Sequence, residues 1–451
     1  MAKVSLRESY RRDDIDHVLH GVTIPSNLAK ALNRIFVEAY GVRLVDSDGK
    51  EYIDGMSSVV CASLGYGNRE LAEAARSQMT KLHLVPSFGN RTSPPEIDLA
   101  RTLADTAPGG IDRFMFTSSG SDSNESAIKI VRWYWRQKGL DKYKIISLQN
   151  AYHGATYGAG SASSFPDYTH KDFGPNLPGF TQVPSPYCYR CPFGKSYPNC
   201  GIQCAEALDH KIQEEGEDTV GAFLAEPAQS AAGVLVPPPE YWPRVAEICQ
   251  EHDVLLIIDE VITGVGRMGR MWACEHWDIR PDILVFSKGI ASGYMPISGV
   301  GVTDEIYQGM TSSDAAFPHV YTYNGHPVSC AVALKNLEIL SREKLIDRGA
   351  EMGLYAQERL THFQEQSPYV GDIRGRGLNF GIELVADKET RQLFPPERKI
   401  VMSVGAQLLE KGIIIGGSGN NIRLAPPLII TKDEIDYVLD GLEWAIQGIQ
   451  A

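Results

Sequence analysis

The chain has 451 residues, and this length suggests two domains or one large domain with a smaller satellite. Its 43% hydrophobic and 22% charged residues are ordinary for a globular protein, while a formal charge of -13 argues against general binding to nucleic acid or to an anionic membrane surface. The first residues are mixed in charge without an apolar core, and no stretch reaches the roughly 18 apolar residues of a membrane span, so we expect a cytoplasmic protein.

The N-terminal region predicts a hairpin followed by two helices. Polar and apolar residues alternate over 43–46 and 51–54, with an Asp-Gly turn between them. Helical spacing covers 71–82, and a second helix is expected over 94–107, capped by Ser93.

A predicted strand at 113–116 leads through a turn into a helix that ends near residue 137. The turn, 117–121, is made of small hydroxyl residues and glycine. Its hydroxyls and free N–H groups at the positive end of a helix can bind phosphate. The turn matches neither a P-loop nor a dinucleotide fingerprint, so it predicts a site for a single phosphate group. A purely structural helix start is the alternative.

The next predicted strand, 144–148, ends near Tyr152 and His153. An aromatic residue and a histidine at the carboxyl end of a strand suit stacking on a flat ligand, although such a pair can also be structural. Residues 163–202 are rich in Pro, Gly and Tyr and predict a long loop, a place where the walls of functional sites are often found.

Four of the eight cysteines lie together in the sequence YCYRCPFGKSYPNCGIQC. Cys188 and Cys191 form a C-x2-C pair, and Cys200 and Cys204 form a C-x3-C pair, a spacing that resembles a zinc site. The looser second pair and the lack of a surrounding zinc module favour a surface loop with reduced thiols. We therefore expect no metal.

Two apolar runs, 254–258 and 283–286, predict strands buried on both faces of a parallel sheet. The first run ends at Asp259, and Lys288 follows the second. In an open α/β sheet the ligand crevice lies outside the carboxyl ends of the strands. Asp259 and Lys288 are therefore predicted to face one site.

The other predicted elements are a strand at 220–225 that ends at Glu226, a helix at 241–251, a strand at 299–302, a helix at 330–345, a β-rich segment at 371–385, a helix at 400–411 and a strand at 421–424. At least five apolar runs thus end in polar residues, which predicts a shared crevice. The last three elements predict a smaller C-terminal domain.

These parts together predict a site for pyridoxal phosphate. A lysine amine attacks carbonyl groups well only when its pKa is lowered. A carboxylate one strand away would hold a pyridinium nitrogen protonated, the turn would take the phosphate, and Tyr152 would stack on the ring. Lys288 would then move a proton to and from the substrate's Cα.

The chain resembles the class III pyridoxal-phosphate-dependent aminotransferases of fold type I over nearly its whole length. The matching motifs are, in order, SSGSDSNESAIK, AYHGAT, AEPAQSAAG, IIDEVITGVGRMG, VFSKGIASGYMPI, TYNGHP, IRGRGLNFGIEL and IRLAPPLIIT. The resemblance implies an α/β fold with a large cofactor-binding domain, residues 66–328, whose mainly parallel sheet is flanked by helices. Residues 1–65 and 329–451 would together form a smaller α+β domain.

The resemblance also assigns cofactor contacts. Lys288 would bind the cofactor covalently, and Asp259 would hydrogen-bond its pyridine nitrogen. Val261 and Tyr152 would pack on opposite faces of the ring. The phosphate would be bound by Ser119, Gly120 and Ser121.

Three further residues follow from the same resemblance. Glu226 would orient groups near the ring and pair with an arginine of the substrate site. His153 would lie behind the residues that touch the cofactor. Thr322 would reach the phosphate from the neighbouring subunit, so that the active site belongs to a homodimer or a dimer of dimers.

Ile262 departs from the pattern of many family members, which have Gln there, so one hydrogen bond to the ring hydroxyl is missing. Arg423 stands where ornithine- and aminobutyrate-type enzymes have the arginine that grips a carboxylate. An exposed strand arginine is the alternative. The flexible arginine of amine:pyruvate enzymes is replaced by Gly416 or Gly417, which favours carboxylate recognition through Arg423.

The predicted activity is transfer of an amino group from an amine or ω-amino acid to an α-keto acid, pyruvate or 2-oxoglutarate, by a ping-pong mechanism. Amino-acid racemases or epimerases, aminomutases and phospho-lyases share every motif and remain the alternative. A non-enzymatic binding protein is disfavoured because Lys288 and Asp259 are intact. The residues expected to shape the substrate pocket are Val59, Val60, Phe88, Tyr152 and the loop 163–202.

Overall fold

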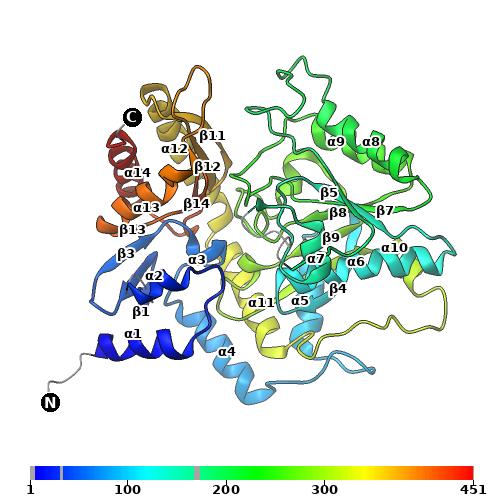
Figure 1. The fold of residues 1–451 in the computed structure, drawn as a ribbon. Coiled ribbons are helices and arrows are strands. Elements are labelled where there is room, and N and C mark those ends of the chain that lie inside the picture. The colour runs from blue at the N-terminus through cyan, green and yellow to red at the C-terminus, as the bar shows by residue number, and fades with distance from the viewer. Residues whose placement is uncertain (1–5, 31–33, 167–172, 450–451) are drawn as a thin grey trace.

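The computed structural model describes residues 6–30, 34–166 and 173–449, and its centre is a seven-stranded sheet (Figure 1). The strands lie in the order β4 (Ile111–Thr117), β10 (Ser298–Thr303), β9 (Ile283–Phe286), β8 (Leu255–Asp259), β7 (Val220–Ala225), β5 (Lys144–Leu148) and β6 (Phe180–Val183). Only β10 runs antiparallel to its neighbours within this sheet, and the other pairings are parallel. The predicted mainly parallel sheet is confirmed.

Both faces of this sheet are buried, as the unbroken apolar runs predict. Alternate residues of one strand point to opposite faces. Ile257 of β8 packs in a cluster with helix α6 (Gly120–Gln137), whereas Ile258 packs in a second cluster with helix α9 (Tyr241–Glu251). Every residue of β7 is likewise buried.

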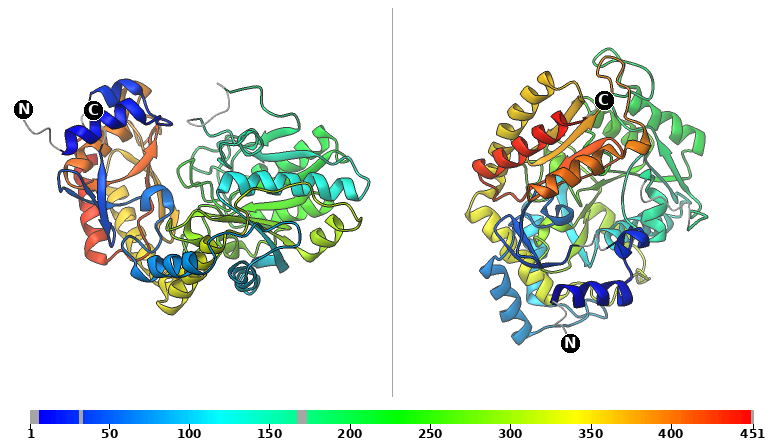
Figure 2. Two further views of the ribbon diagram at one scale, coloured as in Figure 1. Left: turned by 90° about the horizontal axis from the view of Figure 1, so that it is seen from below. Right: turned by 60° about the vertical axis from the view of Figure 1, so that its left-hand side comes forward.

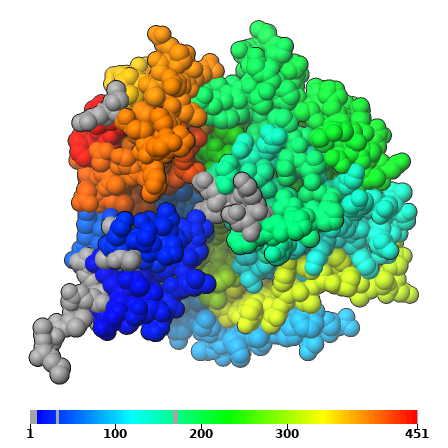
Figure 3. All heavy atoms as spheres, viewed as in Figure 1, coloured from blue at the N-terminus to red at the C-terminus, as the bar shows by residue number. Residues whose placement is uncertain are grey.

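The two ends of the chain meet in two smaller sheets. The first has the order β1 (Phe36–Tyr40), β2 (Arg43–Asp46), β3 (Glu51–Asp54), β13 (Ile413–Ile414), and the second the order β11 (Val370–Arg376), β12 (Asn379–Leu384), β15 (Asn421–Leu424), β14 (Gly416–Ser418). Strand β13 is parallel to β3, with Ile413 opposite Ile53. Figures 2 and 3 show the N-terminal segment beside the C-terminal segment on one side of the molecule. The division at residues 65/66 and 328/329 stays a prediction.

The remaining helices are α1 (Leu6–His17), α2 (Pro25–Ala29), α3 (Ser57–Val60), α4 (Arg69–Lys81), α5 (Pro94–Ala104), α7 (Tyr157–Ala162), α8 (Gln203–Glu215), α10 (Asp304–Met310), α11 (Pro327–Arg342), α12 (Leu345–Gln366), α13 (Ile400–Glu410) and α14 (Lys432–Gln447). Of the helices in the described part of the chain, none has the length and apolar character to cross a membrane. The helices without a predicted counterpart are α1, α2, α3, α7, α8, α10, α12 and α14, and β6 lies in a segment predicted to be a loop.

Ser93 is the N-cap residue of α5, as expected, but its side chain does not take part in the cap. The hydroxyl of Ser93 makes no hydrogen bond with any described residue, and the cap is formed by the backbone alone, since the Ser93 carbonyl accepts the N–H groups of Glu96 and Ile97 at 3.1 Å. Pro94 begins the helix because proline has no N–H to satisfy and its φ already suits a first turn.

Candidate active site

Asp259 and Lys288 lie at the same edge of the large sheet. Asp259 is the last residue of β8, and in the parallel pairing of β8 with β9 it stands opposite Val285. Lys288 follows three residues later, at the start of a one-turn 3-10 helix. Its φ of 46° is rare for a residue with a side chain, and such backbone strain is often found at functional sites.

The surroundings of Lys288 favour a neutral amine. Burial lowers the pKa of Lys288, and the charge of Arg423 acts in the same direction. The Cys61 thiol and the carboxylates of Asp259 and Glu226 oppose this shift. Groups from four separate segments therefore lie within electrostatic reach of the amine, as the predicted crevice requires.

Asp259 is buried and held by three donors. Its Oδ2 accepts the Asn124 side-chain amide at 2.8 Å and lies 2.8 Å from His153 Nδ1. Its Oδ1 accepts the backbone N–H of Val261 at 3.0 Å. Since an ionised carboxylate only accepts, His153 must carry its proton on Nδ1, and its Nε2 has no partner among the described residues.

The predicted phosphate turn forms the start of α6. Ser119 is the N-cap, and its hydroxyl accepts the N–H of Asp122 at 3.2 Å. No acceptor among the described residues bonds the N–H groups of Gly120 and Ser121. These two donors, at the positive end of an 18-residue helix, are free for an anion.

Two glycines keep this turn open. A Cβ on Gly120 would lie 3.0 Å from Cγ1 of Val261, and one on Gly154, whose φ is +142°, would lie 2.6 Å from the Ser121 hydroxyl. The Ser121 hydroxyl also accepts the N–H of Ala155 at 3.0 Å. An anion-binding turn, a buried carboxylate and a lysine with a lowered pKa are the donor set that pyridoxal phosphate needs, so the residues fit this cofactor.

Glu226 follows β7 and is 4% exposed. Its carboxyl group accepts the N–H of Ser230 at 3.0 Å and the N–H of Tyr152 at 3.5 Å. The pKa of Glu226 is raised to about 7, mainly by burial and in part by the charge of Asp259, whereas His153 acts in the opposite direction. Glu226 and Tyr152 are thus brought together with Asp259, as predicted.

The predicted substrate residues, and Thr322, the predicted phosphate contact, lie in different surroundings. Val60 is buried and packs with Ile262, Met56 and Ala425. Arg423 is half-buried on β15, opposite Gly381 and Gly416. Phe88, Thr322 and Val59 are exposed in the single chain. Val60 is therefore enclosed by the single chain and Arg423 partly so, whereas Phe88, Thr322 and Val59 lie on its surface.

Two buried residues of the site are missing from the sequence analysis. Asn124 bonds Asp259, as described above. Arg267, which is 1% exposed, donates to the Leu378 carbonyl at 3.0 Å and to the Ser57 hydroxyl at 3.2 Å. Each lies inside a motif quoted above, but its partners are distant in the sequence and no local pattern indicates these bonds.

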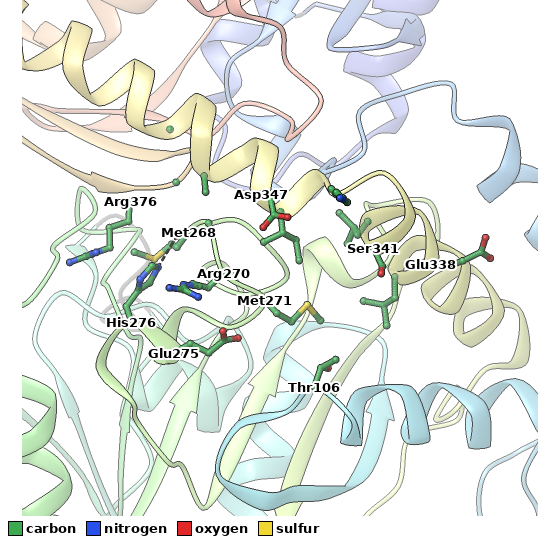
Figure 4. A pocket seen from close by; sticks show the side chains of 18 of the residues that line it. Thr106, Met268, Arg270, Met271, Glu275, His276, Glu338, Ser341, Asp347 and Arg376 are labelled. Atoms are coloured by element: carbon green, nitrogen blue, oxygen red, sulfur yellow. Dashed lines mark hydrogen bonds between the residues drawn. The ribbon is translucent and has the colours of Figure 1, made fainter.

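A large cavity of about 1670 Å³ lies elsewhere (Figure 4). It is bordered by Met268, Arg270 and His276 after β8, by Ser341 of α11 and by Asp347 of α12. None of the predicted site residues lines it. Since cavity size alone carries no chemistry, the candidate site stays at Asp259 and Lys288.

The clustered cysteines border one small cavity of about 20 Å³, in a loop that packs on β11. In the described residues, side chains that could share a metal ion are grouped at Asp209, Glu251 and His252, and the cysteines do not form such a group. The expectation of no metal stays a prediction.

Comparison with known proteins gives one consistent result. The chain matches the family model of aminotransferase class-III over residues 26–446. It is 38% identical to a putrescine–pyruvate aminotransferase of Pseudomonas aeruginosa, over 94% of this chain and 92% of that protein. It is similar to the crystal structure of an (S)-enantioselective ω-transaminase from Thermomicrobium roseum, with TM-score 0.94, 43% identity and coverage of 97% and 98%. An amine transaminase from an uncultivated Pseudomonas species, solved with pyridoxal phosphate bound, gives TM-score 0.92, 33% identity and coverage of 96% and 98%.

Proposed function

The chain belongs to the class III aminotransferase family, and from this premise we propose that its amino donor is a primary amine or an ω-amino acid and its acceptor pyruvate or 2-oxoglutarate. It is a pyridoxal-phosphate-dependent transaminase, as the motifs predict, and works by a ping-pong mechanism. When bound, pyridoxal phosphate carries the amino group and takes up the electron pair left by the substrate's Cα–H bond.

One observation carries the proposal. Asp259 ends β8 and Lys288 follows the adjacent parallel strand β9, so an acid and an amine with a lowered pKa share one edge of the sheet. A binding protein needs no neutral lysine there. An enzyme that attacks carbonyl carbon does.

The chain's own residues would divide the work in the following way. Lys288 Nζ, whose pKa is lowered by burial, would hold the cofactor covalently and would carry a proton to and from the substrate's Cα. Asp259 would hold the proton on the pyridine nitrogen. The N–H groups of Gly120 and Ser121 would bind the phosphate.

Arg423 would select acceptors with a carboxylate. Its guanidinium lies within electrostatic reach of Lys288, the point where the reacting carbon must be held. A guanidinium pairs with a carboxylate through two parallel hydrogen bonds. Glu226 also lies within electrostatic reach of Lys288. It would pair with Arg423 when the substrate has no carboxylate and would release Arg423 when the substrate has one.

The donor side of the pocket would be apolar. Val60, Ile262, Met56 and Ala425 form a buried apolar cluster beside Val261. Methylene or other apolar groups next to the reacting amine would suit this surface. One similar protein is named for putrescine and pyruvate and another as an (S)-enantioselective ω-transaminase, which supports a primary amine as the donor.

The working unit would be a homodimer, or a pair of such dimers. Thr322 is exposed in the single chain, and Phe88 is 44% exposed although it is a large apolar residue. A second copy that covers this surface would bury Phe88 and bring Thr322 to the neighbouring phosphate site. We also propose a cytoplasmic location; the free thiols of all eight cysteines agree with a reducing compartment.

The experiment that tests the function combines a spectrum with a product assay. Purified protein loaded with pyridoxal phosphate should show the absorbance of the lysine-bound cofactor. A primary amine added without an acceptor should abolish that band, and pyruvate or 2-oxoglutarate should restore it with formation of the matching amino acid. If every donor leaves the band unchanged while an optically pure amino acid loses its rotation, the racemase alternative is correct.

A further inference from the structure

Asn124 connects the two ends of the candidate cofactor site. It lies in α6, one turn after Gly120, and is completely buried. Its Nδ2 donates to Oδ2 of Asp259 at 2.8 Å and to the backbone carbonyl of His153 at 2.8 Å. One side chain therefore joins the helix of the phosphate turn to the strand of the predicted pyridine partner.

The orientation of this amide is determined by its partners. A carboxylate and a carbonyl can only accept hydrogen bonds, so a flipped amide would place its oxygen against two acceptors. Asn124 Oδ1 has no partner in the described part of the chain. Both N–H groups of Asn124 are therefore used, while its buried Oδ1 acceptor stays unsatisfied. An unsatisfied buried acceptor lowers the stability of the fold, a cost that a residue with a purely structural role would not need to carry.

Asn124 completes the set of donors around Asp259. With His153 Nδ1 and the Val261 N–H it fills three of the roughly four acceptor positions of a carboxylate. Two of the donors fill Oδ2, and the third lies on Oδ1. The remaining acceptor position is therefore on Oδ1, the oxygen available to a ligand.

The start of α6 is itself tied to the sheet. The Ser123 hydroxyl lies 2.7 Å from that of Thr117 in β4 and 2.5 Å from that of Ser298 in β10, which donates to the Phe286 carbonyl of β9 at 2.6 Å. This chain of buried hydroxyls anchors α6 to the sheet at Ser123, the residue next to Asn124. The helix cannot shift without breaking it.

We propose that Asn124 is a positioning residue that sets the side chain of Asp259 relative to the phosphate turn of the same helix. The rigid first turns of α6 then fix the distance between the groups that hold the two ends of the cofactor. This inference rests on the proposed function, in which Asp259 bonds the pyridine nitrogen.

The test replaces Asn124 with leucine, which has a similar shape and no donor, and with alanine as a second variant. Wild type, N124L, N124A and the helix control S123A are each loaded with pyridoxal phosphate and with its 1-deaza analogue, in which carbon replaces the ring nitrogen. Cofactor affinity of the apo-protein, the pH dependence of the bound cofactor's absorbance, kcat and KM are measured.

With pyridoxal phosphate we expect N124L and N124A to bind the cofactor more weakly, to shift the pH dependence of its absorbance, and to lose about 10- to 100-fold in kcat with KM changed by less than about 3-fold, the range for loss of an orienting partner. With the deaza analogue they should match wild type, because the bond that Asn124 aligns is then absent. S123A, which breaks the hydroxyl chain but no hydrogen bond of Asp259, should lose thermal stability and bind both cofactors more weakly to the same degree.

Equal losses with both cofactors, or an unchanged spectrum in N124L and N124A, would overturn the inference. Failure of the proposed function is distinct from this result. In that case the wild-type protein itself would show no lysine-bound absorbance and no transamination with pyridoxal phosphate.

Discussion

Arg267 and Leu378 hold each other through a reciprocal pair of hydrogen bonds. The Leu378 N–H donates to the Arg267 carbonyl at 3.1 Å, and the Arg267 guanidinium donates to the Leu378 carbonyl at 3.0 Å. The same guanidinium donates to the Ser57 hydroxyl and the Pro426 carbonyl. One buried cation thus connects the segment after β8 to the turn between β11 and β12, to α3 and to the segment after β15.

Replacing Arg267 with methionine should destabilise the protein strongly, because buried acceptors lose their donor. We expect a loss of about 3 kcal/mol or more in the free energy of unfolding, measured by urea denaturation of the apo-protein. Arg348 is a matched control, since it also donates to two backbone carbonyls, those of Ile429 and Ile430, but is only half-buried. R348M should cost about 1 kcal/mol. Equal losses would show that burial of Arg267 has no special effect.

Replacing Lys288 with alanine should abolish the absorbance of the lysine-bound cofactor and lower kcat by at least about 100-fold, because the amine both binds the cofactor and moves the proton. Lys142 is the control: it is 6% exposed, and its amine donates to the carbonyls of His252 and Asp253. K142A should lose stability and keep the cofactor spectrum. A K288A protein that turns over at the wild-type rate would refute the assignment.

Replacing Gly120 with alanine should weaken cofactor binding about 10-fold, because the new methyl group would lie 3.0 Å from Val261 and push the turn from its place. Fluorescence titration of the apo-protein with pyridoxal phosphate measures this. The double variant G120A/V261A should recover part of the loss, since the pair is in contact. G405A is the control, because a Cβ on Gly405 of α13 meets nothing closer than 3.9 Å.

Replacing Glu226 with glutamine should change how stability depends on pH. The pKa of Glu226 rises from 4.5 to about 7 on folding, so the wild-type apo-protein favours the protonated carboxyl group. Its contribution to stability is complete below pH 4.5 and is lost as the pH rises through about 7. Glutamine stays neutral, so E226Q should be more stable than wild type above pH 7, by at most about 3 kcal/mol, and should lose this advantage near pH 4.5.

Thermal unfolding of the apo-protein at a series of pH values measures this effect. The exposed Glu358 of α12 is the control, and E358Q should follow the wild-type curve at every pH. A constant difference between E226Q and wild type over the whole range would contradict the shifted titration.

Mixing two inactive variants tests the shared active site. In a heterodimer of K288A and T322W, one site has both changes and the other has neither. Random exchange of subunits should therefore restore roughly a quarter of the wild-type sites. The control mixture, K288A with D259A, should stay inactive, because Lys288 and Asp259 come from one chain. No recovery in the first mixture, with subunit exchange verified, would argue against the proposed role of Thr322.

The sequence reveals those parts of the fold whose pattern is local. Strands β8 and β9 are unbroken apolar runs because both faces are covered. Helix α12 has Glu, Arg and Gln among its apolar residues, so the helical periodicity of its apolar residues is weaker. Strand β6 has only four residues and lies in a Pro/Gly-rich segment, which hides it among turn signals.

The contacts that organise the site are not local. In the sequence, Asn124 cannot be told from an ordinary polar residue of an amphipathic helix, because its hydrogen-bond partners lie 29 and 135 residues away in the chain. The motifs point to Asp259 and Lys288 because each ends a recognisable strand, whereas nothing near Asn124 indicates a bond to Asp259. The assigned roles of the site residues stay predictions until the variants above are measured.

The parallel pairing of Ile53 with Ile413 has a consequence for biosynthesis. The N-terminal hairpin leaves the ribosome early, but the strand that completes its sheet is made close to the end of translation. We therefore expect the hairpin to keep an unpaired edge through most of synthesis, a state in which strands associate with other chains. Chains that terminate before residue 413 should depend on chaperones and aggregate without them.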